Sequence, residues 1–126
     1  MKEWCITIHQ PYLDLIQEGR KTVELRTRLP KDIGVGDIVY ACLPRSNGEV
    51  RLSFIVSEVL AHTPDCMWRE YREQMQISED RFKRYCQGRD VVFGLRMKEV
   101  ICYTKNPVCV RDLGLKVAPM WFSKVK

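Results

Sequence analysis

The chain has 126 residues, of which 45% are hydrophobic and 29% charged, and its formal net charge is +5. This composition excludes an intrinsically disordered chain, and no apolar stretch approaches the roughly 18 residues of a membrane span. The length predicts a single domain over residues 1–126. An acid at Glu3 and a short apolar run are unlike a signal peptide, so we expect a cytoplasmic protein with no membrane partner.

Cysteine and histidine spacing argues against a metal site. None of the six cysteines forms a Cys-x-x-Cys pair, and the two histidines, His9 and His62, are far apart. We therefore expect neither a metal nor a cofactor. Cys5, Cys42 and Cys102 lie inside apolar runs, which predicts that all three are buried as small hydrophobic side chains.

Positive charge is concentrated in the second half of the chain. Residues 1–63 carry eight Lys/Arg and eight Asp/Glu, whereas residues 64–126 carry thirteen and eight. The basic side chains that gather there are Arg69, Arg72, Arg81, Lys83, Arg84 and Arg89. Such a surface attracts polyanions such as nucleic acid, although a solvated helix face gives the same pattern.

The predicted elements follow from apolar periodicity and from turn residues. A strand over 4–8 is followed by a helix that begins near Pro11 and ends at Gly19, with Tyr12, Leu15 and Ile16 as its apolar stripe. Further strands are predicted over 22–28, 38–43, 49–61 and 91–103. Two helices are predicted over 63–74, capped by Thr63 or Asp65, and over 78–85. A loop and a short closing segment form the tail.

This order predicts an α+β fold, namely a small, mostly antiparallel β-barrel with flanking short helices. A parallel βαβ arrangement fits less well, because only one helix could serve as a crossover. Trp121 and Phe122 near the tail are expected to plug one end of the barrel.

The segment around residues 21–26 carries the most informative chemistry. Strand alternation places Thr22, Glu24 and Arg26 on one face, with Lys21 at the strand entrance. A carboxylate between two cations can orient both toward a phosphate or carbonyl oxygen, and it can itself accept from a base amino group. A salt-bridged rim of the barrel is the simpler alternative.

Three further groups could contact a ligand. His9 and Gln10 precede a helix N-terminus, where backbone N–H groups could hold an anion or the chain could simply turn. Tyr12 could stack on a base or pack in the core. Trp68 and Tyr71 lie among Arg69, Arg72 and Arg81, which suits single-stranded nucleic acid, although helical spacing favours burial of the two aromatic rings.

Residues 8–28 also resemble a known family. The shared pattern is His9-Gln10-Pro11-Tyr12, then Gly19-x-Lys21-Thr22-x-Glu24-x-Arg26, then Gly36-Asp37 before Ile38, and finally 114–119 before an aromatic end. This pattern resembles the ASCH domain family of the PUA-like superfamily over most of the chain. The resemblance implies a β-barrel with a cleft lined by Lys21, Glu24 and Arg26, and a protein that binds RNA or nucleotides.

One bacterial branch of that family hydrolyses N4-acetylcytidine with a Lys, a Thr and a Glu. The Thr lies three residues after the Lys, a position that Glu24 occupies here, while Thr22 lies on a different step of the strand. Glu73 is the candidate match for the Glu. The departure counts against that amidohydrolase activity, while a mechanism in which Glu24 activates water stays open.

We therefore expect an RNA- or nucleotide-binding protein, monomeric or weakly dimeric, with a Lys/Glu/Arg-lined cleft. The alternatives are a nucleoside amidohydrolase or ribonuclease, and a protein-interaction module linked to transcription or translation. The residues expected to contact the ligand are Lys21, Thr22, Glu24, Arg26, His9, Gln10, Tyr12, Arg69 and Arg72. If the protein is an enzyme, its catalytic residues are expected to be Lys21, Glu24 and Glu73.

Overall fold

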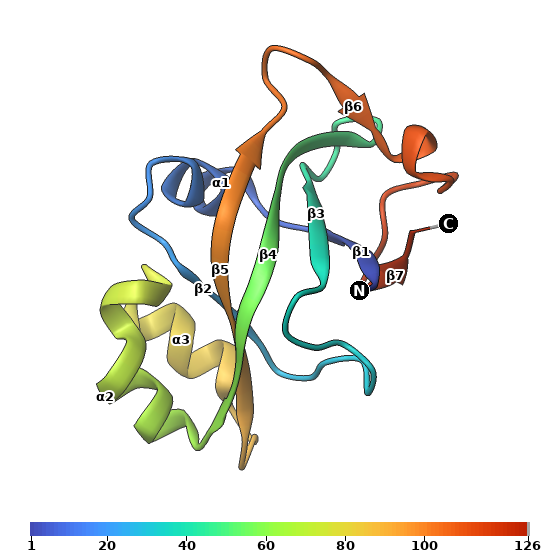
Figure 1. Ribbon diagram of the computed structural model, residues 1–126. Coiled ribbons are helices and arrows are strands. Elements are labelled where there is room, and N and C mark those ends of the chain that lie inside the picture. Colours follow the sequence, from blue (N-terminus) through green and yellow to red (C-terminus); the bar gives the residue numbers. More distant parts are fainter. Residues whose placement is uncertain (126) are drawn as a thin grey trace.

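A computed structural model describes residues 1–125 (Figure 1). Its strands are β1 (Glu3–Thr7), β2 (Val23–Arg26), β3 (Ile38–Cys42), β4 (Glu49–His62), β5 (Val92–Cys102), β6 (Val108–Cys109) and β7 (Ser123–Lys124). Its helices are α1 (Gln10–Gln17), α2 (Pro64–Met75), α3 (Glu79–Cys86) and a 3₁₀ turn (Val110–Leu113). The elements predicted from the sequence are therefore present, with strand and helix ends shifted by a few residues.

All seven strands belong to one sheet in the order β2-β5-β4-β3-β1-β7, with β6 paired to β4. β1 and β3 are parallel, and the other pairings are antiparallel. The predicted α+β class and mostly antiparallel sheet are confirmed. The sheet is barrel-like rather than closed, because within residues 1–125 no ladder joins its edge strands β2 and β7.

The main core lies between the curved sheet and α1. Phe54, Ile6, Leu13 and Ile16 are almost completely buried in it, and Phe122 from the tail packs edge-on against Trp4. The buried residues of α1 are Leu13 and Ile16, whereas Tyr12 and Leu15 are half-buried. The predicted apolar stripe did not include Leu13. The face of α1 that packs against the core is broader than that stripe and includes Leu13. Phe122 anchors the tail in this core.

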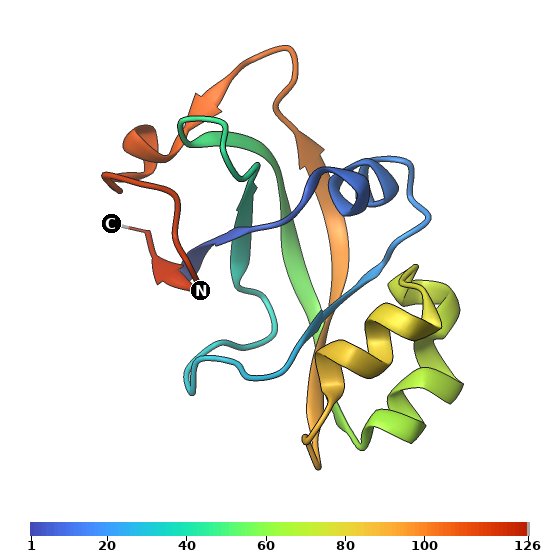
Figure 2. The same cartoon turned by 180° about the vertical axis from the view of Figure 1, so that it is seen from behind.

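A second core lies where α2 and α3 cover one end of the sheet (Figures 1 and 2). Met67, Met75 and Phe82 from these helices pack on Val23 and Leu60 of the strands. Trp68 and Tyr71 are half-buried against the same cluster. The helical spacing thus correctly favoured packing for these two aromatic rings.

The predicted helix signals are confirmed in detail. Gly19 follows α1 with a φ of +79°, a left-handed conformation that glycine adopts without strain. The hydroxyl of Thr63 accepts from the backbone of Cys66 at the start of α2, and that of Ser78 accepts from the backbone of Arg81 at the start of α3. These caps fix where each helix begins.

The Gly-Asp pair before β3 fixes a turn. The carboxylate of Asp37 is almost buried and accepts from the backbone N–H groups of Lys2 and Gly34 and from the indole of Trp4, each at 3.0 Å. One side chain thus ties the first residues of the chain to the start of β3. The motif has a structural role here.

Burial was predicted for three cysteines and is confirmed for two of them. Cys5 and Cys42 are buried, but Cys102 is exposed, so that prediction was wrong. Val100 and Ile101 beside it are also exposed, as are all of the last five residues of β5. Among the helices of residues 1–125, none is long and apolar enough to cross a membrane.

Candidate functional site

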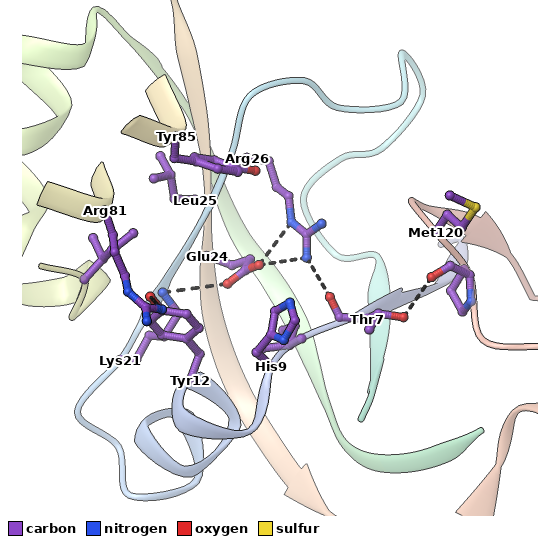
Figure 3. A pocket seen from close by; sticks show the side chains of 13 residues that line it. Thr7, His9, Tyr12, Lys21, Glu24, Leu25, Arg26, Arg81, Tyr85 and Met120 are labelled. Atoms are coloured by element: carbon purple, nitrogen blue, oxygen red, sulfur yellow. Dashed lines mark hydrogen bonds and ion pairs between the residues drawn. The ribbon is translucent and has the colours of Figure 1, made fainter. Parts of the chain in front are cut away.

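A cavity of about 550 Å³ opens between β1, α1, β2, α3 and the segment before β7 (Figure 3). Lys21, Glu24 and Arg26 form its floor, a group that we call the charged triad. The cavity occupies the gap that separates the end of β1 from β2. The cavity therefore lies where the sheet does not close, between two strands that do not pair.

Lys21 enters the cleft directly after the turn that ends α1. Its side chain is only 4% exposed, and its Nζ donates to the backbone oxygen of Met75 at 2.7 Å. Nζ also lies 3.7 Å from Oε1 of Glu24 and 5.1 Å from the ring centre of Tyr12. Burial lowers the pKa of Lys21, and Arg26 adds to this, while the carboxylate of Glu24 acts in the opposite direction.

Glu24 and Arg26 share one face of β2, as the alternation predicted. Oε2 of Glu24 accepts from Nε of Arg26 at 3.0 Å and forms an ion pair with its Nη2 at 2.8 Å. Nη2 also donates to the backbone oxygen of Thr7 at 3.2 Å. Both side chains are largely buried. A guanidinium therefore connects β1 and β2 where backbone pairing does not, and it holds the carboxylate in one orientation.

The mouth of the cleft is built from α1, α3 and the tail. Tyr12 of α1 accepts a 3.5 Å hydrogen bond from Nη1 of Arg81 on α3. Tyr85, one turn further along α3, and Met120 of the tail are exposed at the opening, as is His9. The wall is therefore aromatic and aliphatic, and the cations lie at the floor and on one rim.

The electrostatic balance of the cleft is positive. Its charged lining residues are Lys21, Arg26 and Arg81 against the single carboxylate of Glu24. Such donors suit carbonyl oxygens and anions. Within residues 1–125, no group of three or more His, Cys, Asp or Glu side chains is arranged to hold a metal ion.

The structure brings five of the predicted residues to the cleft: Lys21, Glu24, Arg26, His9 and Tyr12. Gln10 lies outside it, where its amide nitrogen donates to Asp14 at 2.7 Å and its amide oxygen accepts from Arg51. Thr22 is half-buried beside the cleft without lining it, and its backbone N–H donates to Gln74. Both residues therefore have structural contacts that account for them.

The remaining predicted residues lie on α2. Arg69, Arg72 and Glu73 are exposed there and do not line the cleft. Glu73 therefore does not share the cleft with Lys21 and Glu24, with which an enzymatic mechanism would have to combine it. Arg69 and Arg72 belong to an outer basic surface, which we define by Arg69 and Arg72 of α2 and Arg84 of α3.

The cleft also contains residues from segments far from β2 in the sequence, and these were not predicted as cleft residues. Arg81 and Tyr85 lie one turn apart on α3 and face the cleft, and Thr7, Pro119 and Met120 close its other side. A cation and an aromatic ring at i and i+4 on a short basic helix were the available signal. Nothing in the sequence indicated that α3 and the tail would meet beside β2.

Comparison with known proteins places this chain in a family. The ASCH domain model matches residues 6–106, whereas no curated protein matches the sequence. The crystal structure of ASCH from Zymomonas mobilis has a TM-score of 0.85 at 18% identity, covering 99% of this chain and 88% of that one. A mutant of the same bacterial protein has the same TM-score and identity, with 100% and 91% coverage.

A crystal structure of a hypothetical protein is a more distant match, with a TM-score of 0.58 and 20% identity over 76% of this chain and 97% of that one. At these identities the structural matches establish the shared fold alone. The family match, in contrast, spans β1 to β5 and contains the charged triad. The chain therefore belongs to the ASCH domain family.

Proposed function

We propose that this protein binds RNA and holds one nucleotide unit in the cleft above the charged triad. The family is generally linked to RNA binding. The observation that carries the proposal is the floor of the cleft, where Lys21 and Arg26 flank the carboxylate of Glu24 beneath an aromatic wall. A buried polar floor and an apolar wall are what a planar, hydrogen-bonding base requires.

The aromatic residues supply the stacking surface. Tyr12 and Tyr85 both line the cavity, and base–aromatic stacking contributes about 1–3 kcal/mol per base. Arg81 at the rim offers a cation to the phosphate of the same nucleotide. The volume of about 550 Å³ is in the range of small-ligand sites, so the cleft accommodates one nucleotide and not a duplex.

The outer basic surface would attract the rest of the strand. Arg69 and Arg72 are exposed on α2, and Arg84 is exposed on α3. Contacts with phosphates give affinity without base preference and weaken with salt. The cleft would therefore bind one base, and the outer basic surface would bind the phosphates of the neighbouring nucleotides.

The test is a fluorescence-anisotropy titration of labelled single-stranded RNA at two salt concentrations. Wild type is compared with Lys21→Met, which keeps the apolar stem and removes the charge, and with Lys116→Met, an exposed lysine of the tail. Charged hydrogen bonds contribute about 1.5–3 kcal/mol, so Lys21→Met is expected to weaken binding about 10- to 100-fold. Equal RNA affinity of the Lys21→Met and Lys116→Met variants would show that the cleft does not contact the RNA.

A second candidate is hydrolysis of an acylated nucleoside such as N4-acetylcytidine. It is favoured by one observation, the lowered pKa of buried Lys21 beside a carboxylate. In this reaction Glu24 would activate a water molecule and Lys21 would stabilise the developing oxyanion. Release of acetate by wild type, lost in Glu24→Gln, supports it; absence of turnover with intact binding excludes it.

A further inference from the structure

Two arginines lie against two aromatic rings of the tail. The guanidinium carbon of Arg26 lies 5.4 Å from the ring centre of Phe122, and that of Arg28 lies 4.4 Å from the ring centre of Trp121. The centres of these two rings are 5.5 Å apart, in an edge-to-face arrangement. Consecutive aromatic residues therefore hold two arginines that are two positions apart in the chain.

The tail places the Arg28–Trp121 pair beside the cleft. Pro119 and Met120 line the cavity, and the hydroxyl of Thr7 donates to the backbone oxygen of Pro119 at 2.8 Å. Figure 3 shows Met120 on the opposite side of the cleft from Arg81. Trp121 directly follows Met120 in the chain. The Arg28–Trp121 pair therefore adjoins the side of the cleft that lies opposite α3.

The two arginines differ in what they leave open to a ligand. Arg26 is engaged with Glu24 and with the backbone oxygen of Thr7. Arg28 is exposed, and within residues 1–125 it pairs with no carboxylate. A planar guanidinium can lay only one face on the ring of Trp121. The other face of Arg28 is therefore open to solvent.

This arrangement suits a nucleotide better than a bare anion. Bases stack on guanidinium planes as they do on aromatic rings, and the N–H groups at the edge of the plane can donate to phosphate oxygens. A guanidinium already held on a ring has fewer rotamers to lose when a second planar group stacks on it. A bare anion would need the charge alone, without the orientation that Trp121 gives to Arg28.

We propose that Arg28 and Trp121 form a second nucleotide subsite, the tail subsite, in which the base next to the cleft-bound nucleotide stacks on the open face of the Arg28 guanidinium. This inference rests on the proposed function and gives the bound strand a path across the molecule. The strand runs from α3, over the charged triad, to the tail.

The first test uses a labelled single-stranded RNA octamer and fluorescence anisotropy at two salt concentrations. It compares wild type with Arg28→Lys, which keeps the charge but has no plane on which a base can stack. We expect Arg28→Lys to bind about 10-fold more weakly with an unchanged salt slope, because the loss is one of stacking and not of charge. The control is Arg111→Lys, at an exposed position of the 3₁₀ turn, which should bind as wild type does. Equal affinities of the three proteins would overturn the tail subsite.

The second test varies the bases and keeps every phosphate. Octamers with an abasic backbone carry one adenine, two adjacent adenines, or two adenines separated by three abasic nucleotides. We expect wild type to bind the adjacent pair about 10-fold more tightly than the single adenine, and Arg28→Lys to lose this gain. The separated pair should bind within about twofold of the single adenine, since it offers two alternative registers. A gain that survives in Arg28→Lys, or an adjacent pair that binds no more tightly than one adenine, would overturn the assignment.

The failures of the two proposals are distinguishable. RNA binding that weakens in Lys21→Met and is unchanged in Arg28→Lys would overturn the tail subsite and leave the cleft in place. Absence of RNA binding to wild type would overturn the proposed function and the tail subsite with it.

Discussion

The charged triad and the outer basic surface carry the same kinds of side chain in opposite settings. In the triad, the side chains of Lys21 and Arg26 are 4% and 15% exposed and share one carboxylate. On the outer surface, Arg69 and its neighbour Glu70 are 68% and 55% exposed. Water screens the second pair and largely leaves the first unscreened. The charged side chains of the cleft are therefore held in fixed directions, whereas those on α2 can move and can pair with any nearby anion.

This contrast separates two contributions to binding. A fixed, desolvated donor or acceptor can discriminate against a mismatched ligand, because water cannot replace the hydrogen bond that the mismatched ligand fails to make. An exposed arginine attracts any polyanion and adjusts to it. We therefore expect substitutions in the triad to change stability and selectivity, and those on the outer surface to change salt-dependent affinity alone.

The largest effect on stability is expected from Glu24→Ala. It leaves Lys21 and Arg26 as two cations with no carboxylate, in a setting where neither is well hydrated. Removal of one partner from a buried ion pair costs about 3–5 kcal/mol. Urea unfolding of the variant should show a loss near the lower figure, since the cleft admits some water. A loss below about 1 kcal/mol would mean that the triad is solvated like the outer surface.

Arg26→Lys is expected to have the next largest effect. The ammonium keeps the charge but cannot both pair with Oε2 of Glu24 along the planar guanidinium edge and donate to the backbone oxygen of Thr7. The link between β1 and β2 is weakened, and we expect a loss of about 1–2 kcal/mol in urea unfolding. Arg28→Lys, at an exposed position two residues along the chain, serves as the control. Equal losses at both positions would contradict the bridging role.

Alkaline pH should reveal the burial of Lys21. Because its pKa is lowered in the folded protein, the unfolded chain binds more protons between that pKa and the usual value of 10.5. The free energy of unfolding contributed by this group therefore rises with pH across that window and is constant below it. The stability of wild type relative to Lys21→Met should increase there. A parallel pH dependence of the two proteins would show that Lys21 is hydrated.

The smallest effect on stability is expected from the double substitution Arg69→Ala and Arg72→Ala. Exposed side chains contribute little to folding, so the free energy of unfolding should change by no more than about 0.5 kcal/mol. RNA affinity should fall to a similar degree for every sequence. The slope of log affinity against log salt should decrease by about 0.7 for each lost phosphate contact. A change in base preference would place these residues in the reading of the base.

Much of the site followed from local rules. The end of α1 at Gly19 and the two-residue alternation of β2 put Lys21, Glu24 and Arg26 together before any tertiary contact is considered. The choice between a salt-bridged rim and a cleft floor did not follow, because it depends on what covers the strand. Lys21 is covered by Tyr12 of α1 and Met75 of α2, and Arg26 lies over the ring of Phe122 in the tail.

The other residues of the cleft escaped prediction for the same reason. Arg81, Tyr85 and Met120 lie 60 or more positions from Lys21 in the sequence, and no periodicity relates them to β2. Cys102 was expected to be buried because its apolar neighbours matched a core strand, yet the last five residues of β5 are exposed. Alternation indicates which residues share a face, and not whether that face is covered.

The most direct test of base binding in the cleft is a heteronuclear NMR titration of the protein with single-stranded RNA that follows the Nε–H signal of Arg26. This proton is held by Glu24 at the centre of the floor, and no residue of the outer surface contacts it within residues 1–125. If RNA enters the cleft, the Arg26 signal shifts saturably with the RNA, together with the backbone signals of β2. Shifts confined to α2, with the Arg26 signal unmoved, would contradict it.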